Sequence, residues 1–365
     1  MSGPPLHPTL ADRLAELTAL DAPTGFEEPV LRFVRDALAD LCDDVQVDVR
    51  GNVYGRIESP VSNALRVMLT AHADEIGLLV THILPGGFLR FSRLGQPTVM
   101  VLPGQRVRVL TSTGPISAVV GVKPGHVLSS EEARRTPAVE QMYLDVGSSS
   151  AEEAVAWGIE PGTPVVFDAP LTRLHHDDRW FGKAVDNRAG VLCVLEAARS
   201  LSESRPTCTV EFVITVEEEI GLRGAEVAAR RVQPDVVLSV DTVPAGGTPD
   251  LRPDELPWTI GAGPLLKVRE TRGLSTQGPL RQLVREAAEE LQISYQLIVD
   301  TAGITDGTAA QQASGDVAAM VLGLARRYSH SAVELVDLRD LEGLIALSVA
   351  VIHRLQNRSQ LQRLI

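Results

Sequence analysis

The feature that most constrains the fold of this chain is a change in its secondary-structure pattern. Residues 1–76 and residues 168–365 alternate helical stripes with short apolar strands. Between them, residues 77–167 carry short strand-like runs broken by Gly-Gly, Pro-Gly and Thr-Gly-Pro turns, with one brief helical pattern at residues 152–157. A chain of 365 residues is also too long for one simple core. We therefore expect a discontinuous α/β domain, interrupted at residues 77–167 by a small β-barrel or sandwich.

Apolar periodicity places the elements of the α/β domain. Apolar residues recur at helical spacing in several segments, and continuous or alternating apolar runs predict the strands. A Gly-Asn pair at residues 51–52 predicts a hairpin turn, and the Pro- and acid-rich residues 244–257 predict a surface loop. The predicted helices are 26–41, 190–200, 225–231, 280–291 and 341–355, and the predicted strands are 45–49, 53–57, 65–69, 209–216, 236–240 and 318–324.

Composition and charge exclude several classes of partner. Lys and Arg number 34 against 47 Asp and Glu, a net charge of −13, which argues against nucleic acid and anionic membrane surfaces. No apolar segment approaches the length of a membrane span, and residues 1–10 lack the pattern of a secretory signal. Cys42, Cys193 and Cys208 are scattered, which predicts free thiols in a reducing cytoplasm.

Imidazole and carboxylate side chains follow the predicted buried strands. In open α/β sheets, ligand sites form beyond the carboxyl ends of the strands. If the strands are parallel, these side chains meet at one edge of the sheet, with one further carboxylate just before the helix at residues 190–200. The candidates are His72, Asp74, Asp186, Glu218, Glu219, Asp241 and His330.

Each candidate taken alone also has an ordinary structural explanation. A single histidine after a strand is more often a hydrogen-bonded core or surface residue. Asp186 could cap the helix that follows it, and the run 217–219 could be a solvated face. Side chains two residues apart on a strand point the same way, so Asp74 could accept a hydrogen bond from His72, as partners of metal-bound histidines do. Two histidines and three carboxylates together are typical of a pair of zinc, cobalt or manganese ions.

Seven ordered motifs make the chain resemble a known family. The resemblance is to the tetrahedral aminopeptidases, family forty-two of the metallopeptidases in the MH clan, and it covers nearly the whole chain. Any one motif is weak, but their number and order are specific. The motifs are DAPTGFE at 21–27, AHADEIG at 71–77, LPGQRVRV at 102–109, GKAVDNRAG at 182–190, EEEIGLRGA at 217–225, ITDGTA at 304–309 and RYSHSAVE at 327–334.

The resemblance implies a fold and a role for each candidate residue. The fold would be an α/β/α sandwich with a mixed central sheet. Asp186 would bridge two metal ions, His72 and Asp241 would complete one site, and Glu219 and His330 the other. The remaining two roles are those of the general base, Glu218, and of the residue that orients His72, Asp74. The family usually has Gly-Gly-Thr-Asp where this chain has Gly-Ile-Thr-Asp at 303–306, so the isoleucine is expected to reshape that side of the substrate pocket.

The resemblance also implies substrate and assembly. We expect a cytoplasmic enzyme that removes N-terminal residues from peptides, with two divalent metal ions per subunit, zinc or cobalt, or else manganese. Its relatives form dodecameric tetrahedral shells built from dimers, in which the inserted domain contributes contacts, so we expect a large homo-oligomer.

Three alternatives remain open from the sequence. A related deacylase or carboxypeptidase acting on acyl-amino acids would have a similar metal site. A glycoside hydrolase could use paired carboxylates, and some relatives carry the label cellulase. That alternative leaves His72 and His330 without a role and lacks the aromatic residues of a sugar-binding cleft, since aromatics are only 4% of the chain. A binding protein without catalysis is disfavoured because a candidate base, Glu218, accompanies all five candidate ligands.

Overall fold

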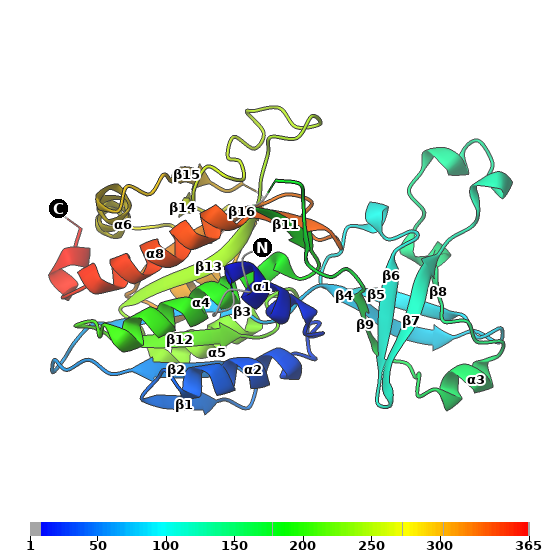
Figure 1. The fold of residues 1–365 in the computed structure, drawn as a ribbon, viewed down its shortest axis with the longest axis horizontal. Helices are drawn as coiled ribbons and strands as arrows, with labels where there is room; N and C mark the ends of the chain where they lie inside the picture. The colour runs from blue at the N-terminus through cyan, green and yellow to red at the C-terminus, as the bar shows by residue number, and fades with distance from the viewer. Residues whose placement is uncertain (1–8, 177, 272, 302, 364–365) are drawn as a thin grey trace, which may run out of the picture.

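The computed structural model describes residues 9–363 except residues 177, 272 and 302, and it has two parts (Figure 1). The larger part holds a central sheet with helices on both faces, and a small β-barrel projects from one end of it. The predicted fold class, an α/β/α sandwich with a mixed sheet and an inserted β domain, is confirmed. Most of residues 1–10, for which no secretory signal is predicted, lie outside the described residues.

The central sheet has eight strands in the order β1-β2-β12-β3-β13-β16-β14-β15. The four middle strands, β12, β3, β13 and β16, run parallel to one another. An antiparallel strand flanks them on each side, β2 beside β12 and β14 beside β16. The middle strands are almost wholly buried, which explains their continuous apolar sequences. The strands are β1 (Asp44–Val47), β2 (Val53–Ile57), β3 (Arg66–His72), β12 (Thr209–Thr215), β13 (Val236–Pro244), β14 (Leu265–Arg269), β15 (Gln296–Val299) and β16 (Ala318–Arg326).

Helices cover both faces of this sheet. Alternate residues of β3 separate the two cores, because Val67 and Leu69 pack on one face and Met68 on the other. The first face is covered by α1 (Leu10–Ala19), α2 (Glu28–Ala39), α4 (Val185–Glu203), α6 (Gly278–Glu290) and α8 (Leu338–Arg354), and the second by α5 (Arg223–Val232) and α7 (Asp306–Ser314).

Among the helices and the strands of the central sheet, α1, α7, β14 and β15 were not predicted from the sequence. The buried residues of α7 are an aspartate, a glycine, a threonine and an alanine, so the helix carries no apolar stripe to reveal it. None of the helices within the described ranges has the length and apolarity needed to cross a membrane. Cys42, Cys193 and Cys208 are all free, as predicted.

The inserted module is a closed six-stranded barrel with its own apolar core. It begins five residues after His72, the last residue of β3, and returns the chain to the larger part after Phe167. The sequence predicted four of its strands, but closure also requires β5 and β8, which join β4 to β7. The barrel strands are β4 (Gly77–Ile83), β5 (Leu89–Leu94), β6 (Arg106–Thr111), β7 (Gly114–Gly121), β8 (Tyr143–Asp145) and β9 (Pro164–Phe167), with helix α3 at Ala151–Ala156.

A third, three-stranded sheet connects the regions that meet at the site. Its order is β10 (Thr172–Arg173), β11 (Arg179–Gly182), β17 (Glu334–Asp337). Gly182 pairs with Glu334, so the chain entering α4 lies beside the chain that follows β16.

Candidate active site

Neighbouring parallel strands deliver the first candidate residues to one edge of the sheet. His72 is the last residue of β3 and pairs with Thr215, the last residue of β12. Asp241 lies on β13 two residues beyond Ser239, which pairs with Thr70 of β3. Glu218 and Glu219 lie in the loop that follows β12, just after Val216 and Glu217. The strands are parallel as the prediction required, and this arrangement brings the side chains to one edge.

Asp186 enters the site from the first turn of α4. Its carboxylate does not cap the helix but faces His72, His330 and Arg326, and the capping bond comes instead from the next residue, Asn187. The adjacent Asn187 fixes this turn, since its Nδ2 donates to the Val240 carbonyl and its Oδ1 accepts from the Gly190 amide. A Cβ at position 190 would lie 2.2 Å from Asn187 Oδ1, so only glycine fits there.

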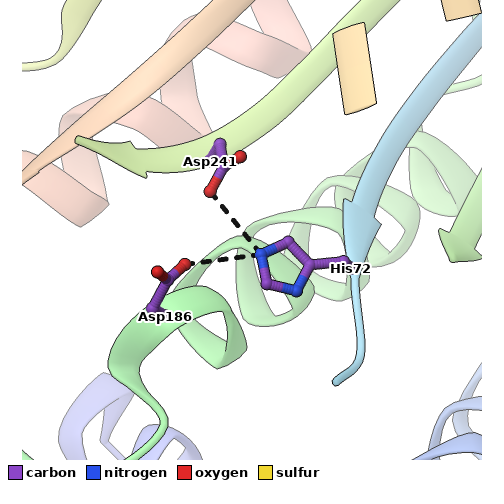
Figure 2. Close-up of side chains that lie close together, drawn as sticks. All are labelled: His72, Asp186 and Asp241. Atoms are coloured by element: carbon purple, nitrogen blue, oxygen red, sulfur yellow. Dashed lines mark ion pairs between the residues drawn. The ribbon is translucent and has the colours of Figure 1, made fainter. Parts of the chain in front are cut away.

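The five candidate ligands form two groups that share Asp186. In the first, His72 Nε2 lies 3.4 Å from Asp186 Oδ1 and 3.7 Å from Asp241 Oδ1 (Figure 2). In the second, His330 Nε2 lies 3.5 Å from Asp186 Oδ2 and 3.7 Å from Glu219 Oε2. The two oxygens of Asp186 therefore face different groups, which is the arrangement of a bridging carboxylate.

The donor set fits a pair of divalent cations. Zinc ligands stand about 2.0–2.2 Å from the ion, so tetrahedral neighbours lie roughly 3.3–3.6 Å apart, close to the separations within each group. Asp186 Oδ1 and Glu219 Oε1 are buried without a hydrogen-bond partner. Buried carboxylate oxygens left in this state are costly unless a cation binds them.

Both imidazoles are oriented by their second nitrogen. His72 Nδ1 lies 3.1 Å from the backbone carbonyl of Asp74 and 3.4 Å from its Oδ1. His330 Nδ1 lies 3.0 Å from the Gln96 carbonyl, at the edge of the barrel. With Nδ1 engaged, Nε2 of each ring is directed at the carboxylates. The backbone carbonyl of Asp74 is thus the closer partner of His72, rather than the carboxylate suggested by the sequence.

Buried carboxylates hold the backbone of the loop after β12. Asp74 accepts from the amides of Glu218 and Glu219, both at 3.1 Å. Glu27, from the motif near the N-terminus, accepts from the amide of Glu217 at 3.2 Å. Three successive amides are therefore fixed by two side chains from distant segments. Burial and the nearby Asp74 raise the pKa of Glu27 to about 7. The motif at 21–27 contains this residue, but its contact with the loop after β12 was not predicted.

Two carboxylates of the site, Glu218 and Glu219, have raised pKa values because they are buried close to other carboxylates. Desolvation raises the pKa of Glu218 well above its ordinary range; His72 opposes this effect, and Asp241 adds to it. Desolvation and Asp186 likewise raise the pKa of Glu219 to about 8. Cations between these groups would reverse both shifts, because a bound metal ion is the largest local charge.

Arg326 and Glu334 are further site residues that the sequence did not reveal. Arg326, the last residue of β16, is buried and places Nη1 2.5 Å from both Asp186 Oδ2 and Glu334 Oε1. Glu334 also accepts from the amides of Asp186 at 2.9 Å and His330 at 3.0 Å. Glu334 is the last residue of the motif at 327–334, and Arg326 directly precedes that motif. An arginine just beyond the end of a predicted buried strand was the one sequence feature that could have pointed to Arg326 as a site residue.

A cavity of about 440 Å³ opens beside the two groups. Its lining includes the candidate ligands and Glu218 together with residues from β14, from the segment 300–305 and from the loop after β13. That loop was predicted to lie only at the surface, but Leu256 near its end and the following Trp258 line the cavity. The cavity is also lined by Val243, Lys267, Asp300, Gly303, Ile304 and Thr305.

Comparison with protein families shows where the chain belongs. The model of the M42 glutamyl aminopeptidase family matches residues 51–347. The chain belongs to this family. The resemblance inferred from the motifs is therefore confirmed, and so is the prediction that the protein is a peptide hydrolase.

Individual members of the M42 family are similar over almost their whole length. The lysyl aminopeptidase of Pyrococcus furiosus is 35% identical, over 91% of this chain and 94% of the relative. An aminopeptidase structure from the archaeon Desulfurococcus kamchatkensis has a TM-score of 0.90 at 35% identity, covering 96% of this chain and 95% of that one. The TET1 peptidase of Pyrococcus horikoshii, described as assembling into a tetrahedron or a large octahedral shell, has a TM-score of 0.83 at 28% identity, covering 94% and 99%.

Proposed function

We propose that this M42 family member is a two-metal aminopeptidase that removes N-terminal residues from peptides. The observation that carries the proposal is the pair of three-residue groups that share Asp186, one oxygen to each. His72 and Asp241 would hold one ion, and Glu219 and His330 the other. Nitrogen and oxygen donors of this kind suit zinc, cobalt or manganese.

The residues around the ions divide the chemistry among them. When bound, the two ions polarise the scissile carbonyl and lower the pKa of the attacking water. Glu218, which lines the cavity but belongs to neither group of ligands, accepts the proton of that water and passes it to the leaving amine. Asp74 acts as a positioning residue, because it fixes the amides of Glu218 and Glu219 and lies against His72. Arg326 and Glu334 hold Asp186 in place through its Oδ2 and its backbone amide.

We further propose a cytoplasmic homo-oligomer, a tetrahedral dodecamer built from dimers, with barrel residues 77–167 contributing contacts. The support is the similarity to a peptidase described as forming a tetrahedron or an octahedral shell. Light scattering and negative-stain microscopy of the purified protein would test this assembly, and a stable monomer at working concentration would contradict it.

The enzymatic proposal is tested with aminoacyl-p-nitroanilides. The protein is first treated with a chelator, then reloaded with zinc, cobalt or manganese, and its metal content is measured. We expect metal-dependent release of p-nitroaniline from unblocked substrates and none from their N-acetylated forms. Silence across the whole panel at full metal content, with turnover of acyl-amino acids instead, would favour the deacylase or carboxypeptidase alternative.

A further inference from the structure

A buried ionic cluster reaches the cavity next to the candidate metal groups through two of its members, Lys267 and Asp300. Lys267 on β14 places Nζ 2.8 Å from Glu270 Oε1 and 3.1 Å from Asp300 Oδ2. All three residues are nearly inaccessible, with exposures of 1%, 0% and 7%. Burial alone would lower the pKa of Lys267, but the two carboxylates outweigh it and hold that pKa above its ordinary value. The ammonium group is thus charged and bound on two sides.

The two carboxylates are themselves fixed in place. Glu270 accepts from the hydroxyl of Thr305 at 2.9 Å and from its amide at 3.3 Å, as well as from the hydroxyl of Thr308. Asp300 Oδ1 accepts from the Gly303 amide at 3.0 Å. Neither carboxylate can turn away from Lys267 without breaking these bonds, so the cluster is preorganised.

The rest of this side of the cavity is apolar. Val243 of β13, Leu256, Trp258 and Ile304 line it. The indole of Trp258 is held by a 2.7 Å hydrogen bond from Nε1 to the Pro244 carbonyl, so its polar edge is already satisfied. A side chain entering here meets hydrocarbon walls and one cluster in which a single ammonium group is shared by two carboxylates.

We propose that this cavity receives the side chain of the N-terminal residue and selects uncharged ones, and that Asp300 determines this selectivity by occupying Lys267. The inference rests on the proposed aminopeptidase function. An acidic side chain would lose its hydration near two fixed carboxylates, while the one ammonium group is already paired. A cationic side chain would lose its hydration beside that same ammonium group and would have to compete with it for the two carboxylates that already bind it. Selection against both thus comes from unfavourable contacts as much as from apolar attraction.

The wild-type enzyme tests the selectivity directly. Glutamine and glutamate have nearly the same shape and differ in charge, so their p-nitroanilides isolate the electrostatic effect. With the metals loaded, we expect kcat/KM for Leu and Gln to exceed that for Glu and Lys by about 10²-fold, the discrimination reached by pocket contacts. Equal or better turnover of the Glu or Lys substrate than of Gln would overturn the inference while leaving the aminopeptidase assignment intact. Absence of release from any of the four would instead count against the proposed function itself.

Asp300→Asn tests the part assigned to this residue. The amide keeps an oxygen for the Gly303 amide but removes one charge from Lys267. We expect the Gln-to-Glu ratio of kcat/KM to fall at least about tenfold, whatever happens to the absolute rate on the Leu substrate. Asp36→Asn, a matched change at an exposed position on α2, is expected to leave the ratio unchanged. An unchanged ratio in a folded, metal-loaded Asp300→Asn enzyme would show that Asp300 is not the determinant, and Asp300→Ser provides the same test if the amide variant does not fold.

Discussion

The two candidate metal-binding groups share Asp186 but are held by different kinds of structure. His72 and Asp241 lie on adjacent parallel strands and are 2% and 5% exposed. Glu219 and His330 lie in loops after β12 and β16, and His330 has a left-handed φ of 54° with 30% of its side chain exposed.

This difference suggests how each group would treat its ion. The first group is part of the sheet, whereas the second depends on contacts between separate segments, such as Gln96 and Thr98 with His330. Ligands on regular elements are positioned more firmly than ligands on loops. We therefore expect the ion of the first group to bind tightly and that of the second group to exchange more readily.

The largest effect is expected from Asp186→Asn, because both groups would lose metal affinity and would no longer differ in how tightly they bind their ions. The variant loses a charge that faces both groups, so both ions weaken, and activity falls by at least about 10²-fold, more than loss of an outer partner would cause. Metal content after dialysis and the rate of p-nitroaniline release measure the two effects. Asp254→Asn, in an exposed loop, is the control. Retention of two tightly bound ions would rule out a bridging role.

Glu218→Gln should leave the metal affinities of the two groups unchanged while removing catalysis. The residue belongs to neither group, so both ions remain, but turnover falls by roughly 10²–10⁴-fold, the usual contribution of a general base. Metal analysis and steady-state kinetics on one preparation measure both properties. Near-normal turnover at full metal content would mean that Glu218 is not the base.

His330→Ala should separate the two groups. Only the second group loses a ligand, so we expect one ion per chain to be retained after dialysis and the affinity for the other to fall by about 10–100-fold or more. His72→Ala is the comparison, and exposed His82→Ala in the barrel is the control. If His330→Ala loses both ions as completely as Asp186→Asn does, the two groups are not independent.

The smallest effect is a pH dependence of the second ion. Burial opposes protonation of His330, but Asp186 and Glu219 outweigh it and raise the pKa of this imidazole to about 9 without metal. Only the neutral ring binds metal, so protons compete below that pH, and affinity should rise as pH increases from 7 to 9, by up to about tenfold per unit. Chelator titrations at pH 7, 8 and 9 measure this. A constant affinity over the range would argue against His330 as a ligand.

The sequence predicted the parts of the site that depend on local pattern. Each parallel strand of the central sheet has an apolar sequence, so the residues that follow it could be predicted as site candidates. The structure brings His72, Asp241 and Glu219 together with Asp186 and His330. Their catalytic roles remain predictions. The fold was predictable for the same reason, whereas β5 and β8 of the barrel were missed because short, half-buried strands carry a weak pattern.

What could not be predicted depends on packing between distant segments. Arg326 is one of many arginines until the fold places it against Asp186. Glu27 contacts the loop after β12 across a sequence separation of 190 residues. The cluster around Lys267 likewise joins β14 to the segment at residue 300. Such long-range pairs have no periodic signature.

The position of the barrel also has a consequence for how the chain folds. β3 must pair with β12, yet the whole barrel and α4 are made between them during synthesis. Contacts this distant in sequence form slowly, because a long loop must close first. A barrel with its own core that collapses as soon as it leaves the ribosome would bring Leu78 beside Val165 and shorten that loop to residues 73–76 and 168–208. Early folding of the inserted barrel would then speed the pairing of β3 with β12, the strands that carry His72 and precede Glu218.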